Sequence, residues 1–201
     1  MFEFGNVRFR PIEKADLALL HEWENDSELM MLSRSRPMNF ASNAQLERQY
    51  DEWSRDDNTL RFLLETMAPK EPVGVARVEK QDQGNVRSAD IGTYIGNKEF
   101  WGRGLGKQVT VALLELVFIQ LNLERCEAWS VEYNSRAHTV LEGCGFKKGG
   151  ALRQAVYVNG RKWDLFHFDL LREEYMAARV ALVKEALGVK VTEYMERLQS
   201  L

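Results

Sequence analysis

One stretch of the sequence, residues 89–131, places a glycine-rich turn between a strand-like segment and a long apolar segment. The turn FWGRGLGK follows ADIGTYI and precedes QVTVALLELVFIQL, after which RCEAWSV is again strand-like. A strand, a helix and a strand in this order predict a parallel pair of strands. A glycine turn at a helix start also presents backbone N–H groups at the positive end of the helix dipole, which is a favourable place for phosphate.

The segments around this unit predict a mixed sheet in one domain. FEFGNVRFRPI, LRFLLET and PVGVARVEK have the alternation of strands, whereas DLALLHEWEND, NAQLERQYDEW and NSRAHTVLEGCGF have helical spacing. ALRQAVYVNGRKWDLFHFDLL predicts a hairpin, with Asn159-Gly160 at its tip. No linker separates these segments, so the sequence predicts one domain. The mixture of strands and helices predicts an α/β (α+β) fold.

Two common phosphate-binding motifs do not fit the glycine turn. A P-loop needs glycine at position 101 and Ser or Thr at position 108, where this chain has Trp101 and Gln108. A dinucleotide-binding turn needs glycine where Lys107 stands, and it normally follows the first strand of the domain. A third phosphate-containing ligand that such a turn could bind is coenzyme A.

The turn resembles the pyrophosphate-binding motif Q/R-x-x-G-x-G/A of the GCN5-related N-acetyltransferases (GNAT). Trp101 departs from the first position of that motif, but FWGRGLGK is similar to the version in the branch with ribosomal-protein N-terminal acetyltransferases and spermidine acetyltransferases. LHEWENDSELM, ADIGTYIG, VEYNSRAHTVLEGCGF and the hairpin segment also resemble this branch, in the same order. The resemblance covers roughly residues 5 to 175.

The resemblance implies a mixed, mostly antiparallel sheet whose central parallel strand pair splays around acyl-CoA, with helices on both faces. It implies a GNAT domain at residues 1–175 and leaves residues 176–201 as a C-terminal helical extension. The implied activity is transfer of the acetyl group of acetyl-CoA, as a co-substrate, to a primary amine of a protein N-terminus or a small molecule. The alternatives are a non-catalytic CoA-binding protein and an enzyme that uses another acyl-CoA, such as succinyl-CoA.

The resemblance also implies which residues hold the cofactor. Backbone amides of the glycine turn would bind the pyrophosphate, and the strand before it would pair with the pantetheine arm and offer an amide near Ile95 to the thioester oxygen. Asn134 matches an asparagine that contacts the arm, although it equally suits a helix N-cap. The expected cofactor-binding residues are Thr93, Tyr94, Ile95, Trp101, Gly102, Arg103, Gly104, Leu105, Gly106, Lys107 and Asn134.

Two acids are candidates for the base that removes a proton from the ammonium group of the acceptor, namely Asp90 and Glu127. A general acid is not evident, because Leu141 and Ala137 stand where relatives have Tyr or Ser. The CoA thiolate is itself a tolerable leaving group. Arg34 and Arg36, between the first two helices, could bind an acidic group of the acceptor.

Composition limits the other partners. The net charge of -3 gives no reason to expect nucleic acid or an anionic membrane as the main partner. With two cysteines there is no disulfide framework, so the sequence suits a cytoplasmic enzyme. His21, His138 and His167 lack metal-ligand spacing, and we expect no metal site.

The C-terminal extension carries an apolar stripe at helical spacing. Such a stripe must be buried, either by folding back on its own domain or against a second copy in a homodimer. The stripe consists of Met176, Val180, Val183, Leu187, Val191, Tyr194, Leu198 and Leu201.

Overall fold

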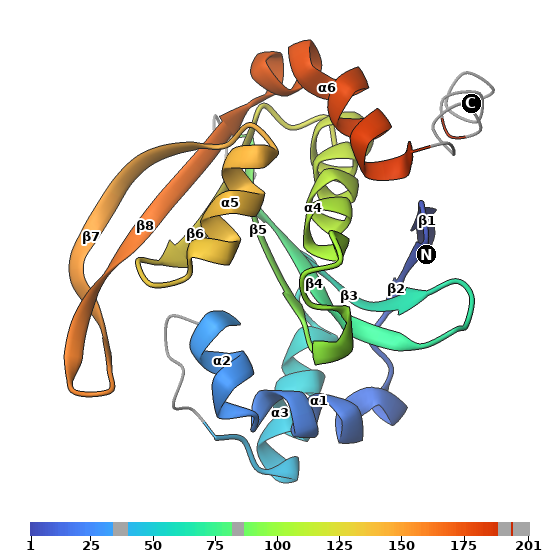
Figure 1. Cartoon of the computed structure of the whole chain (residues 1–201). Helices are drawn as coiled ribbons and strands as arrows, with labels where there is room; N and C mark the ends of the chain where they lie inside the picture. The colour runs from blue at the N-terminus through green and yellow to red at the C-terminus, as the bar shows by residue number, and fades with distance from the viewer. Residues whose placement is uncertain (34–39, 82–86, 189–193, 195–201) are drawn as a thin grey trace.

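The computed structural model describes residues 1–33, 40–81, 87–188 and 194. Its centre is an eight-stranded sheet with the order β1-β2-β3-β4-β5-β6-β8-β7 (Figure 1). The strands are β1 (Phe2–Phe4), β2 (Val7–Pro11), β3 (Thr59–Thr66), β4 (Pro72–Gln81), β5 (Ser88–Ile95), β6 (Arg125–Val131), β7 (Lys147–Val158) and β8 (Arg161–Leu171).

The parallel pair predicted from residues 89–131 is confirmed as β5 and β6, and the other neighbouring strands of the sheet are antiparallel. β5 and β6 share three residue pairs, of which Asp90 and Glu127 form the last. Both strands continue beyond this pair, to Ile95 and Val131. The two strands therefore separate at the centre of the sheet.

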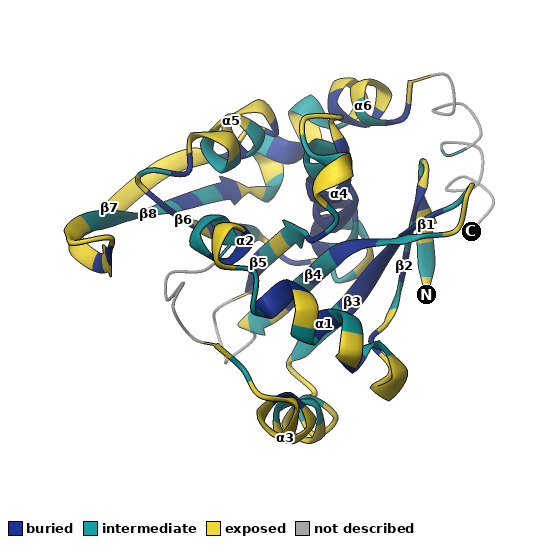
Figure 2. Ribbon diagram, turned by 60° about the horizontal axis from the view of Figure 1, so that its bottom comes forward, coloured by how far each residue is buried: buried dark blue, intermediate teal, exposed yellow. Residues whose placement is uncertain are grey.

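Helices cover both faces of the sheet, as expected (Figure 1). Two successive residues of β3 point to opposite faces of the sheet. Leu63 packs in the apolar cluster under α1 and α2, whereas Leu64 packs in the larger core with α4 and α6. The described helices are α1 (Leu17–Glu24), α2 (Ser27–Ser33), α3 (Asn43–Trp53), α4 (Leu105–Glu115), α5 (Ser135–Gly143) and α6 (Arg172–Leu187). Figure 2 shows the buried residues concentrated on the strands and on the inner sides of these helices.

The N-terminal segments differ from the expectation in two places. The single strand expected over FEFGNVRFRPI is a hairpin of β1 and β2, because Gly5 adopts a positive φ of 62° and turns the chain. The first helix is followed by a second short helix, α2, which the sequence analysis did not predict. Asn25 and Asp26 separate the two, and the Asp26 side chain accepts a hydrogen bond from the Leu29 N–H.

The C-terminal segment folds back on its own domain over the part that the structure describes. α6 lies against α4, with Val183 and Leu187 of the predicted stripe buried in the main core. Met176 and Val180 of the same stripe are exposed. Val191, Leu198 and Leu201 lie outside the described residues.

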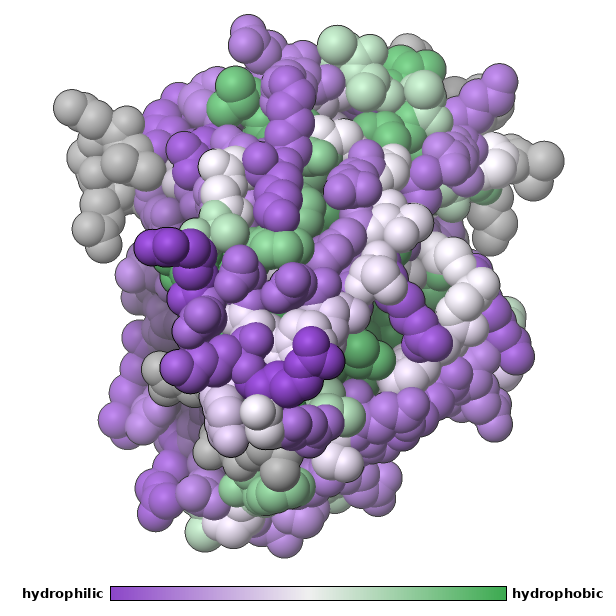
Figure 3. Space-filling view, turned by 60° about the vertical axis from the view of Figure 1, so that its left-hand side comes forward, coloured by the Kyte–Doolittle hydropathy of each residue, from purple (hydrophilic) through white to green (hydrophobic). Residues whose placement is uncertain are grey.

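The hairpin of β7 and β8 forms one edge of the sheet, and the first nine residues of β7 are exposed. Figure 3, viewed from this side, shows hydrophilic residues over most of the surface, interrupted by small hydrophobic areas. Among the described helices, none has the length and apolar character that a membrane span requires.

Candidate active site

The glycine loop lies at the start of α4, with Gly104 as its N-cap. Gly102 and Gly104 have positive φ angles of 72° and 78°, and a Cβ atom on either would meet no atom within 4 Å. The strain of a positive φ therefore explains the choice of glycine here, and the space in front of the loop is open to a ligand. Gly104 offers no side chain to the first N–H groups of α4, so these donors remain for an anion.

Three other side chains of the loop contact other parts of the protein. Leu105 is buried in the core, and the guanidinium of Arg103 lies 5.7 Å from the ring centre of Phe100. The ammonium group of Lys107 forms an ion pair with Glu185 of α6. Binding of a phosphate through the backbone amides of the loop stays a prediction.

Trp101, which departs from the usual motif, has a structural role. Its indole N–H donates a hydrogen bond of 2.7 Å to the carbonyl of Ile95, the last residue of β5. The guanidinium of Arg136, from the first turn of α5, lies 5.4 Å from the centre of the indole ring. Trp101 thus ties the glycine loop to the end of β5 and to α5.

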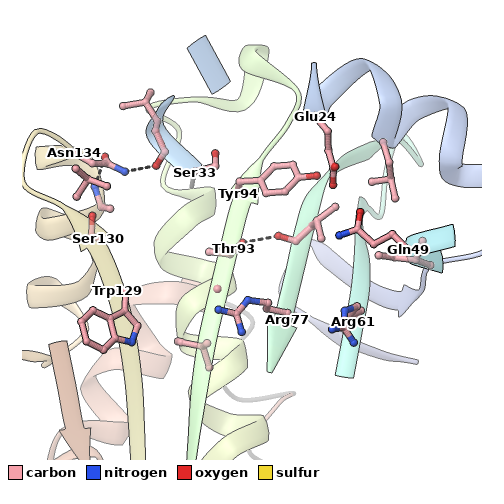
Figure 4. Close-up of a pocket in the computed structure, with 18 of the residues that line it drawn as sticks. Glu24, Ser33, Gln49, Arg61, Arg77, Thr93, Tyr94, Trp129, Ser130 and Asn134 are labelled. Carbon is pink, nitrogen blue, oxygen red and sulfur yellow. Dashed lines mark hydrogen bonds between the residues drawn. The ribbon is translucent and has the colours of Figure 1, made fainter. Parts of the chain in front are cut away.

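A cavity of about 520 Å³ lies beside the separated ends of β5 and β6 (Figure 4). The side of β5 that faces β6 has no strand partner beyond Asp90 among the described residues. An extended ligand can bind to such an edge as an added strand. The residues that line the cavity are Ile12, Leu20, Glu24, Leu32, Ser33, Gln49, Trp53, Arg61, Val75, Arg77, Ile91, Gly92, Thr93, Tyr94, Trp129, Ser130, Val131, Asn134, Ala137 and Leu165.

The predicted pantetheine-binding residues of β5 line this cavity in part. Thr93 is exposed there and donates a hydrogen bond of 3.0 Å from its hydroxyl to the carbonyl of Val75. Tyr94 packs edge-on against Trp23, and its hydroxyl points toward Glu24 in Figure 4. Ile95 packs against the main core.

Asn134 serves as the N-cap of α5, because its side-chain oxygen accepts a hydrogen bond of 3.1 Å from the Ala137 N–H. Its amide nitrogen donates to the carbonyl of Leu32 at 2.5 Å, and the neighbouring Tyr133 hydroxyl donates to the carbonyl of Met31 at 2.7 Å. Both contacts hold the end of α2 against the cavity. This bridge joins residues about a hundred positions apart in the chain, so no local sequence signal predicts it.

Asp90 is buried, at 5% exposure, immediately before the β5 residues that line the cavity. Its Oδ1 accepts a hydrogen bond of 2.5 Å from Arg77, and its Oδ2 has no hydrogen-bond partner among the described residues. Burial raises the pKa of Asp90 to about 6, because it outweighs the opposing effect of Arg77, and Glu79 and Glu127 raise it further. A carboxylate with this pKa can exchange protons near neutral pH.

Glu127, the second candidate acid, has both oxygens engaged. Oε1 lies 3.0 Å from a guanidinium nitrogen of Arg125, and Oε2 lies 2.9 Å from Nε2 of His167. The His167 ring lies 4.6 Å from the ring of Trp129, which lines the cavity. Neither Trp129 nor His167 was expected at the site, although Trp129 follows Glu127 at the two-residue spacing that places side chains on one face of a strand.

The helix α5 supplies no evident acid. Leu141 is buried in the core, and Ala137 lines the cavity without a polar group. His138 has Nε2 3.1 Å from the carbonyl of Val131 and lies against two phenylalanine rings. Burial raises the pKa of the Cys144 thiol to about 12, so this group is not a nucleophile.

Two further predictions concern residues elsewhere in the chain. Arg34 and Arg36, which were proposed to bind an acidic group of the acceptor, lie outside the described residues. No group of histidine, cysteine, aspartate and glutamate suited to a metal ion occurs among the residues that the structure describes.

A parallel strand pair that separates beside a cavity, followed by an open glycine loop at a helix start, suits a transferase that uses an acyl-CoA. A comparison with protein families matches residues 6–147 to the acetyltransferase (GNAT) domain. The chain therefore belongs to the GNAT acetyltransferase family, and it is an acetyltransferase that uses acetyl-CoA.

Several relatives are similar to most of the chain. The chain is 29% identical over 170 residues to an uncharacterized N-acetyltransferase, p20, of Bacillus licheniformis, covering 84% of this chain and 94% of the relative. It is 27% identical to spermidine N(1)-acetyltransferase of Vibrio cholerae over 86% of this chain and 96% of that protein. The crystal structure of a spermidine N-acetyltransferase from Vibrio cholerae in complex with CoA and spermine is similar, with a TM-score of 0.75 and 26% identity, covering 85% of this chain and 98% of the other.

The residues present fit acetyl-CoA. The open space in front of Gly102 and Gly104 leaves room for a phosphate group beside the free backbone donors of α4. The edge of β5 that has no strand partner in the described part of the chain leads from this loop toward Asp90. Both features are backbone features, which explains why the side chains of the loop are free to serve in structural contacts.

Proposed function

We propose that the chain acetylates the primary amine of a small molecule by direct attack on the thioester, and that Asp90 removes the proton from the attacking amine. The observation that carries this proposal is the position of Asp90 at the point where β5 and β6 separate, with one buried oxygen left without a hydrogen-bond partner among the described residues. The spermidine acetyltransferases, which resemble the chain over most of its length, support a small amine as acceptor.

Acetyl-CoA, when bound, supplies the thioester. The N–H groups at the start of α4 bind its pyrophosphate, and the free edge of β5 aligns its arm so that the thioester lies between the separated strands. Trp101 holds the end of β5 through the Ile95 carbonyl, which fixes the backbone amides of this region in place. A backbone N–H at the end of β5 can then stabilise the developing negative charge on the carbonyl oxygen.

Asp90 binds the ammonium group of the acceptor through Oδ2 and takes one of its protons. Arg77 holds the opposite oxygen, so the carboxylate keeps its orientation during the transfer. The amine nitrogen forms the new bond to the carbonyl carbon and gives up its second proton to solvent. The carbon–sulfur bond breaks, and its electron pair leaves on the thiolate sulfur. Solvent protonates the thiolate, because a thiol-like pKa of about 8.5 lies above neutral pH.

A transfer assay tests the proposal. Release of the CoA thiol is measured with a panel of small primary amines and with a short peptide that has a free N-terminus, and mass spectrometry identifies the acetylated product. A tertiary amine, which cannot form an amide, is the control acceptor. We expect thiol release and an acetylated product with at least one small amine. Transfer to the peptide alone would contradict the small-molecule acceptor.

A further inference from the structure

Two arginines lie side by side in the wall of the cavity. Arg61 of β3 and Arg77 of β4 are direct partners in the register of the two strands, and Arg77 is in turn the partner of Gly92 of β5. All three residues line the cavity. They form one row across the sheet, from the outer part of the cavity to the point where β5 and β6 separate.

Gly92 brings this row close to the reaction centre. A Cβ atom at Gly92 would lie 3.0 Å from Nε of Arg77, so the absence of a side chain lets the arginine lie across β5. Gly92 follows Asp90 by two residues, and both therefore face the same side of the strand. Figure 4 shows the Arg77 side chain extending toward β5, with Arg61 on the side away from Trp129. A group bound by Arg77 would thus be close to an amine bound by Asp90.

The charges of the cavity wall do not suit a polyamine. Like charges directly opposite each other on neighbouring strands destabilise a sheet. Acidic partners offset this repulsion between the two arginines. Arg61 pairs with Asp56 at 3.0 Å, and Arg77 pairs with Glu79 at 2.8 Å and with Asp90 at 2.5 Å. Among the described residues that line the cavity, however, two arginines accompany one carboxylate, that of Glu24. A second cationic nitrogen of a polyamine would meet these two guanidinium groups, whereas an anionic group of the acceptor could accept hydrogen bonds from them.

We propose that the acceptor is an amine that also carries an anionic group, a carboxylate or a phosphate, and that Arg61 and Arg77 bind this group. The inference rests on the proposed function and names the substrate class of the same site. The planar guanidinium groups present parallel N–H donors that match the two oxygens of a carboxylate or phosphate. Arg61 is held against Trp53, with its guanidinium 5.3 Å from the ring centre, and is therefore a preorganised specificity residue.

Matched acceptors test the inference. Putrescine and 4-aminobutyrate share a four-carbon chain and one amine, and they differ in whether the other end is an amine or a carboxylate. Ethanolamine and O-phosphoethanolamine form the corresponding phosphate pair. We expect kcat/KM to be at least about tenfold higher for an anionic member than for its partner, because only the anionic group can form charge-assisted hydrogen bonds with the two guanidinium groups. The pair with the larger ratio distinguishes a carboxylate from a phosphate.

The variant Arg61→Met tests the residue itself. It should raise KM for the preferred anionic acceptor by about tenfold while kcat stays nearly constant, and the rate with putrescine should not fall. Arg8→Met is the matched control, because Arg8 also lies on a strand and pairs with an acid, Glu3, at 2.8 Å, but does not line the cavity. Binding of the anionic acceptor to the protein without acetyl-CoA, measured by calorimetry, should weaken in Arg61→Met and not in Arg8→Met.

The outcomes separate this inference from the proposed function. Efficient acetylation of putrescine or spermidine, with no gain for the anionic partners, would overturn the anionic acceptor and leave the proposed function in place. An anionic preference that survives unchanged in Arg61→Met would overturn the role of the arginine row. Absence of transfer to every amine of the panel would overturn both proposals.

Discussion

Asp90 and Glu127 are the last residue pair that the parallel strands β5 and β6 share before they separate. The two carboxylates differ in their contacts. Glu127 is bound by Arg125 and His167, whereas one oxygen of Asp90 has no hydrogen-bond partner among the described residues. We therefore assign the proton transfer to Asp90, and we expect Glu127 to fix the neighbouring histidine.

Replacing Asp90 tests this assignment. Asp90→Asn should lower kcat/KM by about 10²–10⁴-fold, the usual contribution of a general base. Glu79→Gln is the control, because Glu79 binds the same Arg77 but is half exposed. That variant should keep the rate within about threefold, as expected for an exposed ion pair. Full activity of Asp90→Asn near neutral pH would exclude Asp90 as the base.

The pH dependence of the rate follows from the pKa of Asp90, which burial raises to about 6. Below this pH the carboxyl group is protonated and cannot accept a proton, so kcat/KM should fall about tenfold per pH unit. Above it the carboxylate is ionised and can take a proton from the bound ammonium group, so kcat/KM should level off. In Asp90→Asn the acidic limb near pH 6 should disappear, while Glu127→Gln should retain it. An unchanged limb in Asp90→Asn would assign it to another group.

The buried carboxylate of Glu115 joins α6 to α4. It accepts hydrogen bonds from Tyr175 at 2.6 Å, from Arg179 at 2.7 and 2.8 Å, and from Tyr194 at 2.6 Å. Burial raises the pKa of Glu115, but the hydrogen bonds from Arg179 and the two tyrosines outweigh it, and the resulting pKa lies below the ordinary value. Since α4 begins at the glycine loop, this cluster stabilises the helix that carries the CoA site.

Removing the cation of this cluster should destabilise the fold. Arg179→Met leaves Glu115 buried without its charge partner and should lower the free energy of unfolding by about 3–5 kcal/mol at pH 7, measured by urea denaturation. Because the pKa of Glu115 is lowered in the fold, its ionised form stabilises the protein above the unfolded pKa, and this stability is lost as the pH falls through the folded pKa. The difference between wild type and Arg179→Met should therefore shrink at acidic pH. Arg153→Met, an exposed arginine on β7, should change stability by less than about 0.5 kcal/mol.

We propose that residues 176–201 form an extension that completes the core of the 1–175 domain. Deleting the residues after Tyr175 removes Leu182, Val183 and Leu187, which are buried in the structure. We expect the truncated chain to expose apolar surface and to aggregate, and the full chain to be a monomer by light scattering at micromolar concentration. A full-length dimer that becomes a soluble monomer on truncation would instead identify the extension as the seam of a homodimer.

The sequence predicts the features that depend on local backbone chemistry. The glycine spacing and the flanking strand and helix predicted a glycine turn at the start of a helix, and the structure has this turn before α4, with Gly104 as the N-cap. The Asn159-Gly160 turn likewise predicted the hairpin of β7 and β8, in which both residues have positive φ. Such signals lie within a few residues of the structure that they determine.

Features that depend on contacts between distant segments could not be predicted. The Glu115 cluster joins residues 60 to 79 positions apart. The row of Arg61 and Arg77 depends on the register between β3 and β4, and a one-residue slip would place these side chains on the opposite face. The indole of Trp101 was expected at the cofactor, and its hydrogen bond to Ile95 became visible only in the fold.

Binding of acetyl-CoA by the glycine loop is the central claim, and calorimetry with Gly104→Val tests it most directly. Gly160→Val is a matched control, because Gly160 also has a positive φ, of 74°, with no atom within 4 Å of a Cβ, but lies at the tip of a distant hairpin. Both variants carry a similar backbone strain, of about 1–2 kcal/mol. We predict that wild type and Gly160→Val bind acetyl-CoA with similar affinity, while Gly104→Val, still folded by circular dichroism, loses detectable binding. Unchanged affinity in Gly104→Val would contradict the assignment of the loop as the CoA site.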